Sequence, residues 1–246
     1  MSLLLNYTKT VLFMTSVQAF RYTFLAGGTC WILSRLPESW KVAHRIQAVP
    51  IQNQDLVREV KNSVVTIAFY GFLFATIFNP TVRPLTRIYL HADEKGWLWF
   101  LISFPILVLI HDTYFYWMHR ALHVPAIFKK AHRVHHLSTN PTPLASQSFH
   151  PIEAFFEMVW IVPVICLIPI HLKVLIAFSV FSMSYNVYGH LGVEIFPVGW
   201  RKLPILKWLN TATHHNGHHK YYVGNFGLYF LFWDRWLKTE RTVHPT

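Results

Sequence analysis

Histidines that could hold metal ions gather in a few short stretches of this 246-residue chain. Three stretches are regularly spaced boxes, a separate histidine ends the run 186–190, and another directly precedes the last box. The boxes are His119-Arg-Ala-Leu-His123, His132-Arg-Val-His135-His136 and His215-Asn-Gly-His218-His219. On a helix, positions i, i+3 and i+4 share one face. Each box is therefore expected to point two or three imidazoles in the same direction.

Neutral imidazole is a good ligand for iron, zinc, copper and nickel. Eight to ten clustered histidines are too many for one ion and fit two. Zinc proteases use His-Glu-x-x-His, with the glutamate as base, and soluble di-iron bundles use Glu-x-x-His; the boxes contain neither pattern. The sequence predicts a pair of ions held by histidines, with these candidate ligands: His119, His123, His132, His135, His136, His190, His214, His215, His218 and His219.

Two simpler interpretations compete with metal binding. A lone histidine is more often structural than a ligand, and we interpret His171 in this way, at a hairpin tip. Three others are expected to be ordinary surface residues: His44, His91 and His244. Packing alone explains two copies of one box poorly, because buried imidazoles without partners cost free energy. The net charge of +11 also suits nucleic acid. However, the basic residues are interleaved with apolar segments and no nucleic-acid motif is present, so no nucleic-acid partner is expected.

The composition favours a membrane protein. The chain is 53% hydrophobic and only 13% charged, whereas soluble domains carry roughly 25% charged residues. Apolar segments near the ~20 residues that cross a bilayer core cover residues 11–33, 63–79 and 97–117, and a longer apolar block covers 154–188. Arg21 interrupts the first of them. The predicted fold is all-α, a polytopic membrane helical bundle of about four transmembrane helices.

The block 154–188 decides whether the boxes can meet. Pro163, Pro169, His171 and Lys173 interrupt it, which favours two helices in a C-terminal hairpin and places both histidine-rich regions in one compartment. A single bent span would instead separate them. The same regions carry most of the positive charge, namely Arg120, Lys129, Lys130, Arg133, Arg201, Lys202, Lys207 and Lys220. The positive-inside rule puts that face in the cytoplasm, as a helical cap on the inner membrane of a bacterium or the endoplasmic reticulum of a eukaryote.

At the histidine boxes the chain resembles the fatty acid hydroxylase/sterol desaturase superfamily of membrane di-iron enzymes. The likeness runs over residues 97–238. The similar segments are 111–123, 132–136, 186–190, 214–219 and the closing Trp-Asp-Arg at 233–235, while 141–151 looks most like sterol C5-desaturases. Some members carry a histidine where this chain has Asn186.

The resemblance implies one membrane-embedded domain over 1–246, with a catalytic core at about 97–238. It also implies two iron ions (Fe2+/Fe3+), O2 as co-substrate, a membrane lipid as substrate, and an external electron donor such as cytochrome b5 or a ferredoxin. The chain lacks the His-Pro-Gly-Gly of a fused cytochrome b5 domain, so we expect the reductant to come from elsewhere. The expected activity is lipid desaturation or hydroxylation.

Two residues outside the ligand set are candidate catalytic residues. Asp112 is expected to orient a ligand imidazole by accepting its second ring N–H, or else to be a helix-end charge, and His150 to support the site or line the substrate entrance. Two other functions stay open. A zinc-dependent membrane hydrolase would need a nearby carboxylate base, which the boxes lack. A metal-binding membrane transporter would need ligands along the middle of its spans, whereas these histidines lie outside them.

Overall fold

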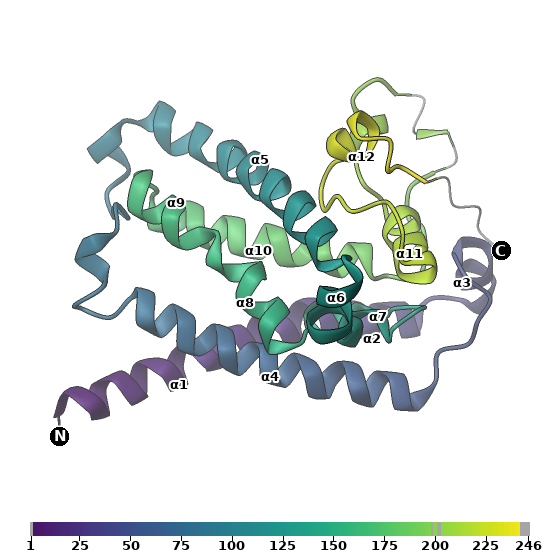
Figure 1. Cartoon of the computed structure of the whole chain (residues 1–246), viewed down its shortest axis with the longest axis horizontal. Helices are drawn as coiled ribbons and strands as arrows, with labels where there is room; N and C mark the ends of the chain where they lie inside the picture. Colours follow the sequence, from purple (N-terminus) through teal and green to yellow (C-terminus); the bar gives the residue numbers. More distant parts are fainter. Residues whose placement is uncertain (1, 198, 201–202, 242–246) are drawn as a thin grey trace.

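The computed structural model describes residues 2–197, 199–200 and 203–241, and the regular elements in this part are helices. Extended pairing is limited there to three isolated bridges. The predicted all-α class is therefore confirmed. Long helices run side by side through most of the molecule, and the short helices α6, α7, α11 and α12 gather at one end of them (Figure 1). Three residues discussed above lie outside the described residues, namely Arg201, Lys202 and His244.

The N-terminal helix is continuous but irregular. It consists of α1 (Ser2–Tyr22), a π-helical turn (Thr23–Gly27) and α2 (Gly28–Arg35), followed by the short helix α3 (Glu38–His44). The π turn follows Arg21, whose guanidinium is hydrogen-bonded to Ser179 of α10. The polar side chain that interrupts this apolar segment thus has a partner inside the bundle.

Two helices are long and apolar enough to cross a bilayer. They are α4 (Asn53–Ile77) and α5 (Trp97–Leu122), with 25 and 26 residues. α4 contains the predicted span 63–79 except its last two residues, and α5 contains the whole of 97–117. No other helix in the described ranges meets both criteria of length and composition. Length and composition thus identify two candidate spans, compared with the four predicted.

The apolar block after the second box forms three helices. These are α8 (Pro151–Val159), α9 (Ile161–Leu167) and α10 (Leu172–Gly189). His171 caps α10, since its Nδ1 accepts a hydrogen bond from the Lys173 amide (2.9 Å) and its Nε2 donates to the Leu90 carbonyl (2.8 Å). Residues of α5, α9 and α10 form the largest apolar core, which includes Leu107, Ile165 and Phe178.

The second and third histidine boxes lie on short elements next to this core, whereas the first box is at the end of α5. After α5 come α6 (Pro125–Ile127), a π-helical turn (Phe128–His132) and α7 (Arg133–His136). The C-terminal part adds α11 (Ala212–Tyr221) and α12 (Phe232–Trp236). Because α5 and α10 end beside these short helices (Figure 1), the long helices set the positions from which the boxes approach one another.

Candidate metal centre

Nine of the ten predicted ligands converge in two histidine clusters. Cluster A contains His119, His123, His132, His136 and His218, and cluster B contains His135, His190, His215 and His219. Within each cluster, one ring nitrogen from every residue lies within 4.8 Å of all the others. All nine are buried except His123, which is partly buried. The chain therefore collects its imidazoles in a region largely closed to water.

Each i, i+3, i+4 box contributes to both clusters. His132 and His136 lie in cluster A and His135 in cluster B, whereas His215 and His219 lie in cluster B and His218 in cluster A. Residues i and i+4 stack on one side of a helix, and residue i+3 is rotated away from i+4 by about 100°. The two boxes thus divide between the clusters in opposite ways. Because α7 and α11 face each other, the two clusters are neighbours.

Hydrogen bonds in cluster A fix which ring nitrogens are free. Nδ1 of His119 lies 2.9 Å from the Phe226 carbonyl, and Nδ1 of His218 lies 2.7 Å from the Gly224 carbonyl. A carbonyl oxygen only accepts, so both Nδ1 atoms carry the proton and both Nε2 atoms carry a lone pair. These Nε2 atoms point inward: His119 Nε2 lies 3.1 Å from His132 Nε2, and His218 Nε2 lies 3.1 Å from His136 Nε2.

Cluster B repeats the arrangement. Nδ1 of His190 donates to the Asn186 carbonyl (2.7 Å), and Nδ1 of His219 donates to the Ser138 carbonyl (2.9 Å). The His190 Nε2 lone pair then lies 3.2 Å from His215 Nε2 and 3.4 Å from His135 Nε2. Ligand nitrogens about 2.1 Å from one ion and about 90° apart are separated by about 3 Å. The spacings in both clusters therefore fit imidazoles arranged around a cation.

Several buried ring nitrogens also lack a partner among the described residues. They are His123 Nε2, His135 Nδ1, His136 Nδ1 and His219 Nε2. Buried polar atoms are nearly always hydrogen-bonded, so an unpaired one needs an explanation. A metal ion explains those that face the clusters, His123 Nε2 and His219 Nε2, because each offers a ligand lone pair. The residues present thus fit a centre for two metal ions.

Burial also keeps these imidazoles in the form that binds metal. Desolvation lowers the pKa of His190 to about 4. It likewise lowers, well below the ordinary value, the pKa of each of six others, with neighbouring imidazoles adding to the effect: His132, His135, His136, His215, His218 and His219. Metal ions require neutral imidazole. At neutral pH the histidines of the clusters are therefore neutral imidazoles, each with one ring nitrogen free to bind a metal ion.

His214 lies in neither cluster of the described residues. Its Nδ1 is hydrogen-bonded to Thr211 Oγ1 (2.8 Å), and its Nε2 lies 3.7 Å from a carboxylate oxygen of Glu240. The residue sits at the start of α11, before the face that points to the clusters. The structure thus gives His214 polar partners of its own, away from the other nine candidates.

Asp112 and His150 also have partners other than the histidines of the clusters. Asp112 accepts hydrogen bonds from the Tyr229 and Phe230 amides (2.8 and 3.2 Å), because α5 packs beside the C-terminal loop there. That loop supplies the carbonyls that hold His119 and His218. His150 is partly exposed and caps α8, where its Nδ1 accepts from the Ile152 amide (3.2 Å). Both residues therefore bond to backbone amides rather than to an imidazole of the clusters.

The boxes lack a carboxylate, but folding brings one to them. Glu153 Oε1 lies 2.7 Å from His132 Nδ1, and both side chains are buried. Glu153 and Glu157, one turn further along α8, line a cavity of about 10 Å³. The cavity is lined by Phe115, His119, His132, His135, Phe149, Glu153, Glu157, Asn186 and His215. It has room for about one water molecule and touches both clusters. The one weak signal of Glu153 in the sequence is an acidic residue among apolar ones, three residues after His150.

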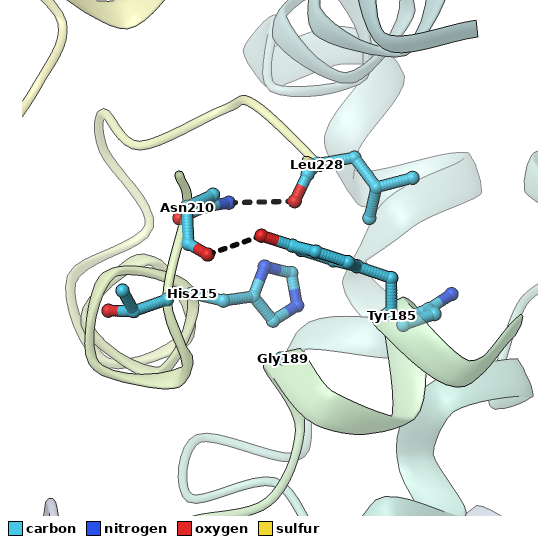
Figure 2. Close-up of a pocket in the computed structure, with 7 residues that line it drawn as sticks. Tyr185, Gly189, Asn210, His215 and Leu228 are labelled. Atoms are coloured by element: carbon cyan, nitrogen blue, oxygen red, sulfur yellow. Dashed lines mark hydrogen bonds between the residues drawn. The ribbon is translucent and has the colours of Figure 1, made fainter. Parts of the chain in front are cut away.

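A second pocket lies beside cluster B, where α10 and α11 pack together (Figure 2). The Tyr185 hydroxyl donates to the Asn210 carbonyl (2.6 Å), and the Asn210 amide donates to the Leu228 carbonyl (3.2 Å). His215 extends from α11 toward Gly189, where an added Cβ would lie 3.2 Å from the imidazole. Glycine at position 189 thus lets α10 approach this ring closely.

Comparison with known proteins agrees with this geometry. The family model described as fatty acid hydroxylase matches residues 104–239. The Delta(7)-sterol 5(6)-desaturase ERG3B of Gibberella zeae is 29% identical over 195 residues, covering 79% of this chain and 58% of that protein. The lathosterol oxidase of Homo sapiens is 30% identical over 183 residues, covering 72% and 58%.

The chain thus spans somewhat under two thirds of the length of these relatives. No solved structure matches it. The family match covers more than half of the chain and contains every histidine of both clusters. This chain is therefore homologous to sterol desaturases and lathosterol oxidases and belongs to the fatty acid hydroxylase family.

Proposed function

We propose that this chain is a membrane oxidoreductase that uses O2 to desaturate or hydroxylate a lipid, with two iron ions held by clusters A and B. One observation carries the proposal: in each cluster, Nε2 atoms of histidines whose Nδ1 donates elsewhere lie 3.1–3.4 Å from a neighbouring Nε2. In the pair His119–His132 both Nδ1 atoms are bonded elsewhere, so two Nε2 lone pairs face each other and repel unless a cation lies between them. Family membership supports iron among the metals that imidazole suits.

The chain's own residues divide the work. Nine imidazoles would hold the ions, and the carbonyls of Phe226, Gly224, Asn186 and Ser138 orient four of them. Phe115 and Phe149 line the cavity beside both clusters and would place an apolar surface next to the hydrocarbon part of a substrate. When bound, the two irons would supply the O2 activation that removing hydrogen from an unactivated C–H bond requires.

The substrate we propose is a sterol-like membrane lipid. The curated relatives named above carry sterol names, and the cavity between the clusters adjoins the long helices of the bundle. Desaturation removes two hydrogens from adjacent carbons, and hydroxylation inserts one oxygen. Which of the two occurs depends on where the carbon is held relative to the ions.

The reaction needs an external reductant. Reduction of O2 to two water molecules takes four electrons, and desaturation supplies two, so two must come from a donor. The donor class we propose is a small one-electron carrier such as cytochrome b5 or a ferredoxin. It would act on the cap formed by α6, α7, α11 and α12, where the clusters lie.

The membrane arrangement is part of the proposal. In addition to α4 and α5, we propose that the N-terminal helix crosses or enters the bilayer. We propose the same for a C-terminal hairpin, whose first arm is α8 with α9 and whose second arm is α10. The whole chain would then form one domain, with the catalytic core at about 97–238. Lys129, Lys130 and Arg133 are exposed, and the positive-inside rule places their face in the cytoplasm.

Two measurements test the proposal. Metal analysis of the purified protein should find about two irons per chain, and lipid oxidation should require O2 and a reductant. Mass spectrometry of lipids from cells with and without the protein should find a species lighter by two hydrogens or heavier by one oxygen. A single tightly held zinc with turnover that is independent of O2 would instead indicate a hydrolase.

A further inference from the structure

His132 has an unusual partner among the cluster histidines. Four cluster histidines donate a hydrogen bond from Nδ1 to a backbone carbonyl, namely His119, His190, His218 and His219. His132 instead lies 2.7 Å from the carboxylate of Glu153. The two side chains are 2% and 1% exposed. This carboxylate–imidazole contact is buried, and it uses the opposite ring nitrogen from the one that faces His119.

We infer that Glu153 is a positioning residue that holds His132 in cluster A and makes the two metal positions unequal. The inference rests on the proposed metal centre. A carboxylate acceptor keeps the proton on Nδ1, which leaves Nε2 for the ion, and it raises the basicity of the ring. Such partners typically change metal affinity about 10–100-fold.

The backbone around His132 explains why an outside anchor matters. His132 ends the π-helical turn Phe128–His132 and is the residue before α7. A π turn inserts an extra residue and breaks the regular rotation of side chains along a helix. The direction of this ring is thus poorly set by its own helix. Glu153 supplies the direction from α8, across the cavity wall.

Burial and the neighbouring Glu157 raise the pKa of Glu153 well above its ordinary value, but the helix dipole of α8 opposes this shift. Glu153 occupies the third position of α8, after Pro151, and the positive end of a helix dipole favours an anion there. Its Oε2 is buried with no hydrogen-bond partner among the described residues. Cluster B has neither a fifth histidine nor a carboxylate in contact with its rings, as far as the described chain shows. Cluster A should therefore hold its ion more tightly.

The test compares three variants with the wild-type chain, all purified in detergent with 57Fe. Glu153→Ala removes the acceptor, whereas Glu153→Gln keeps a neutral acceptor of the same shape. Glu59→Gln is the matched control, because Glu59 is equally buried in α4 but accepts a hydrogen bond from Thr142 (2.5 Å) instead of an imidazole. Each is dialysed against graded concentrations of a chelator, and iron per chain is measured together with the Mössbauer spectrum.

We expect Glu153→Ala to release one ion at about 10–100-fold lower chelator strength while the second stays bound, and Glu153→Gln to fall between this variant and the wild type. One of two Mössbauer subspectra should shift, and Glu59→Gln should match the wild type. Wild-type metal retention and spectrum in both Glu153 variants would overturn the inference, as would equal losses in Glu59→Gln. If Glu153→Ala fails to fold, Glu153→Gln decides by its spectrum. A wild-type protein that binds no iron would instead overturn the proposed function.

Discussion

The imidazoles of His136 and His219 belong to different clusters, yet their ring centres lie 4.7 Å apart. The two residues come from α7 and α11, which are separated by 75 residues of sequence that include α8, α9 and α10. This contact joins the clusters into one centre. The two clusters are therefore neighbours, as a centre in which two ions act on one O2 molecule would require.

Loss of one ligand from either cluster should abolish activity. His218→Ala removes a cluster A ligand and His135→Ala removes a cluster B ligand. Each is expected to reduce lipid oxidation to background and iron from about two to about one per chain, while the protein still inserts into membranes. Iron analysis and lipid mass spectrometry of the two variants check this.

His214→Gln serves as the comparison for those variants. His214 lies next to the third box but bonds to Thr211, outside both clusters. We expect this variant to keep about two irons per chain. Loss of an ion here would show that the ligand set extends beyond the nine clustered histidines.

Asp112 should matter for stability more than for metal chemistry. One oxygen, Oδ1, accepts both the Tyr229 and the Phe230 amides, so Asp112→Asn can keep both hydrogen bonds through its own Oδ1. Asp112→Ala leaves two buried donors unpaired and should lower the free energy of unfolding by about 1–3 kcal/mol for each. Denaturant unfolding in detergent measures the difference. Equal stability of the two variants would contradict this role.

Acid should empty and destabilise the centre. Burial lowers the pKa of His190 to about 4, whereas an unfolded histidine titrates near about 6.5. Below that pH the unfolded chain takes up protons that the folded clusters cannot, so stability present above about pH 6.5 is lost progressively toward pH 4. Unfolding temperature and bound iron, measured from pH 8 to pH 4, should fall together. Constant values across this range would argue against neutral buried imidazoles.

The contact between α1 and α4 should tolerate no side chain at position 71. A Cβ added to Gly71 would lie 2.0 Å from Thr15 Oγ1 and 2.6 Å from Thr15 Cα. Because the backbone of Thr15 is involved, the helices themselves must separate. Gly71→Ala should lower stability by about 1–3 kcal/mol, measured by thermal unfolding, whereas Gly28→Ala, with open space around its Cα, should have little effect.

The sequence predicted what depends on local spacing. The i, i+3, i+4 boxes identified the histidines that converge, and the apolar runs 63–79 and 97–117 identified the cores of α4 and α5. Spacing alone could not show how each box divides between the clusters. That division depends on the π turn before His132 and on how α7 faces α11, which arise from packing between distant segments.

Partners far along the chain were the least predictable. The carboxylate of Glu153 reaches His132 only because α8 folds back beside the second box, and nothing in the box indicates it. Asp112 lies two helical turns before His119, on the same face of the helix, and this position suggested an imidazole partner. Its hydrogen bonds go to a loop 117 residues away in sequence. Helical periodicity carries no information about such loops.

The second and third boxes each contribute ligands to both clusters, so binding of both ions would depend on one contact, the packing of α11 against α7. If α11 lifts away from α7, cluster A loses His218 while cluster B loses His215 and His219. Separation of α11 from α7 would therefore release both ions together. Metal loading during biosynthesis should correspondingly wait until the last box, near the C-terminal end, has been made and has closed over the first two.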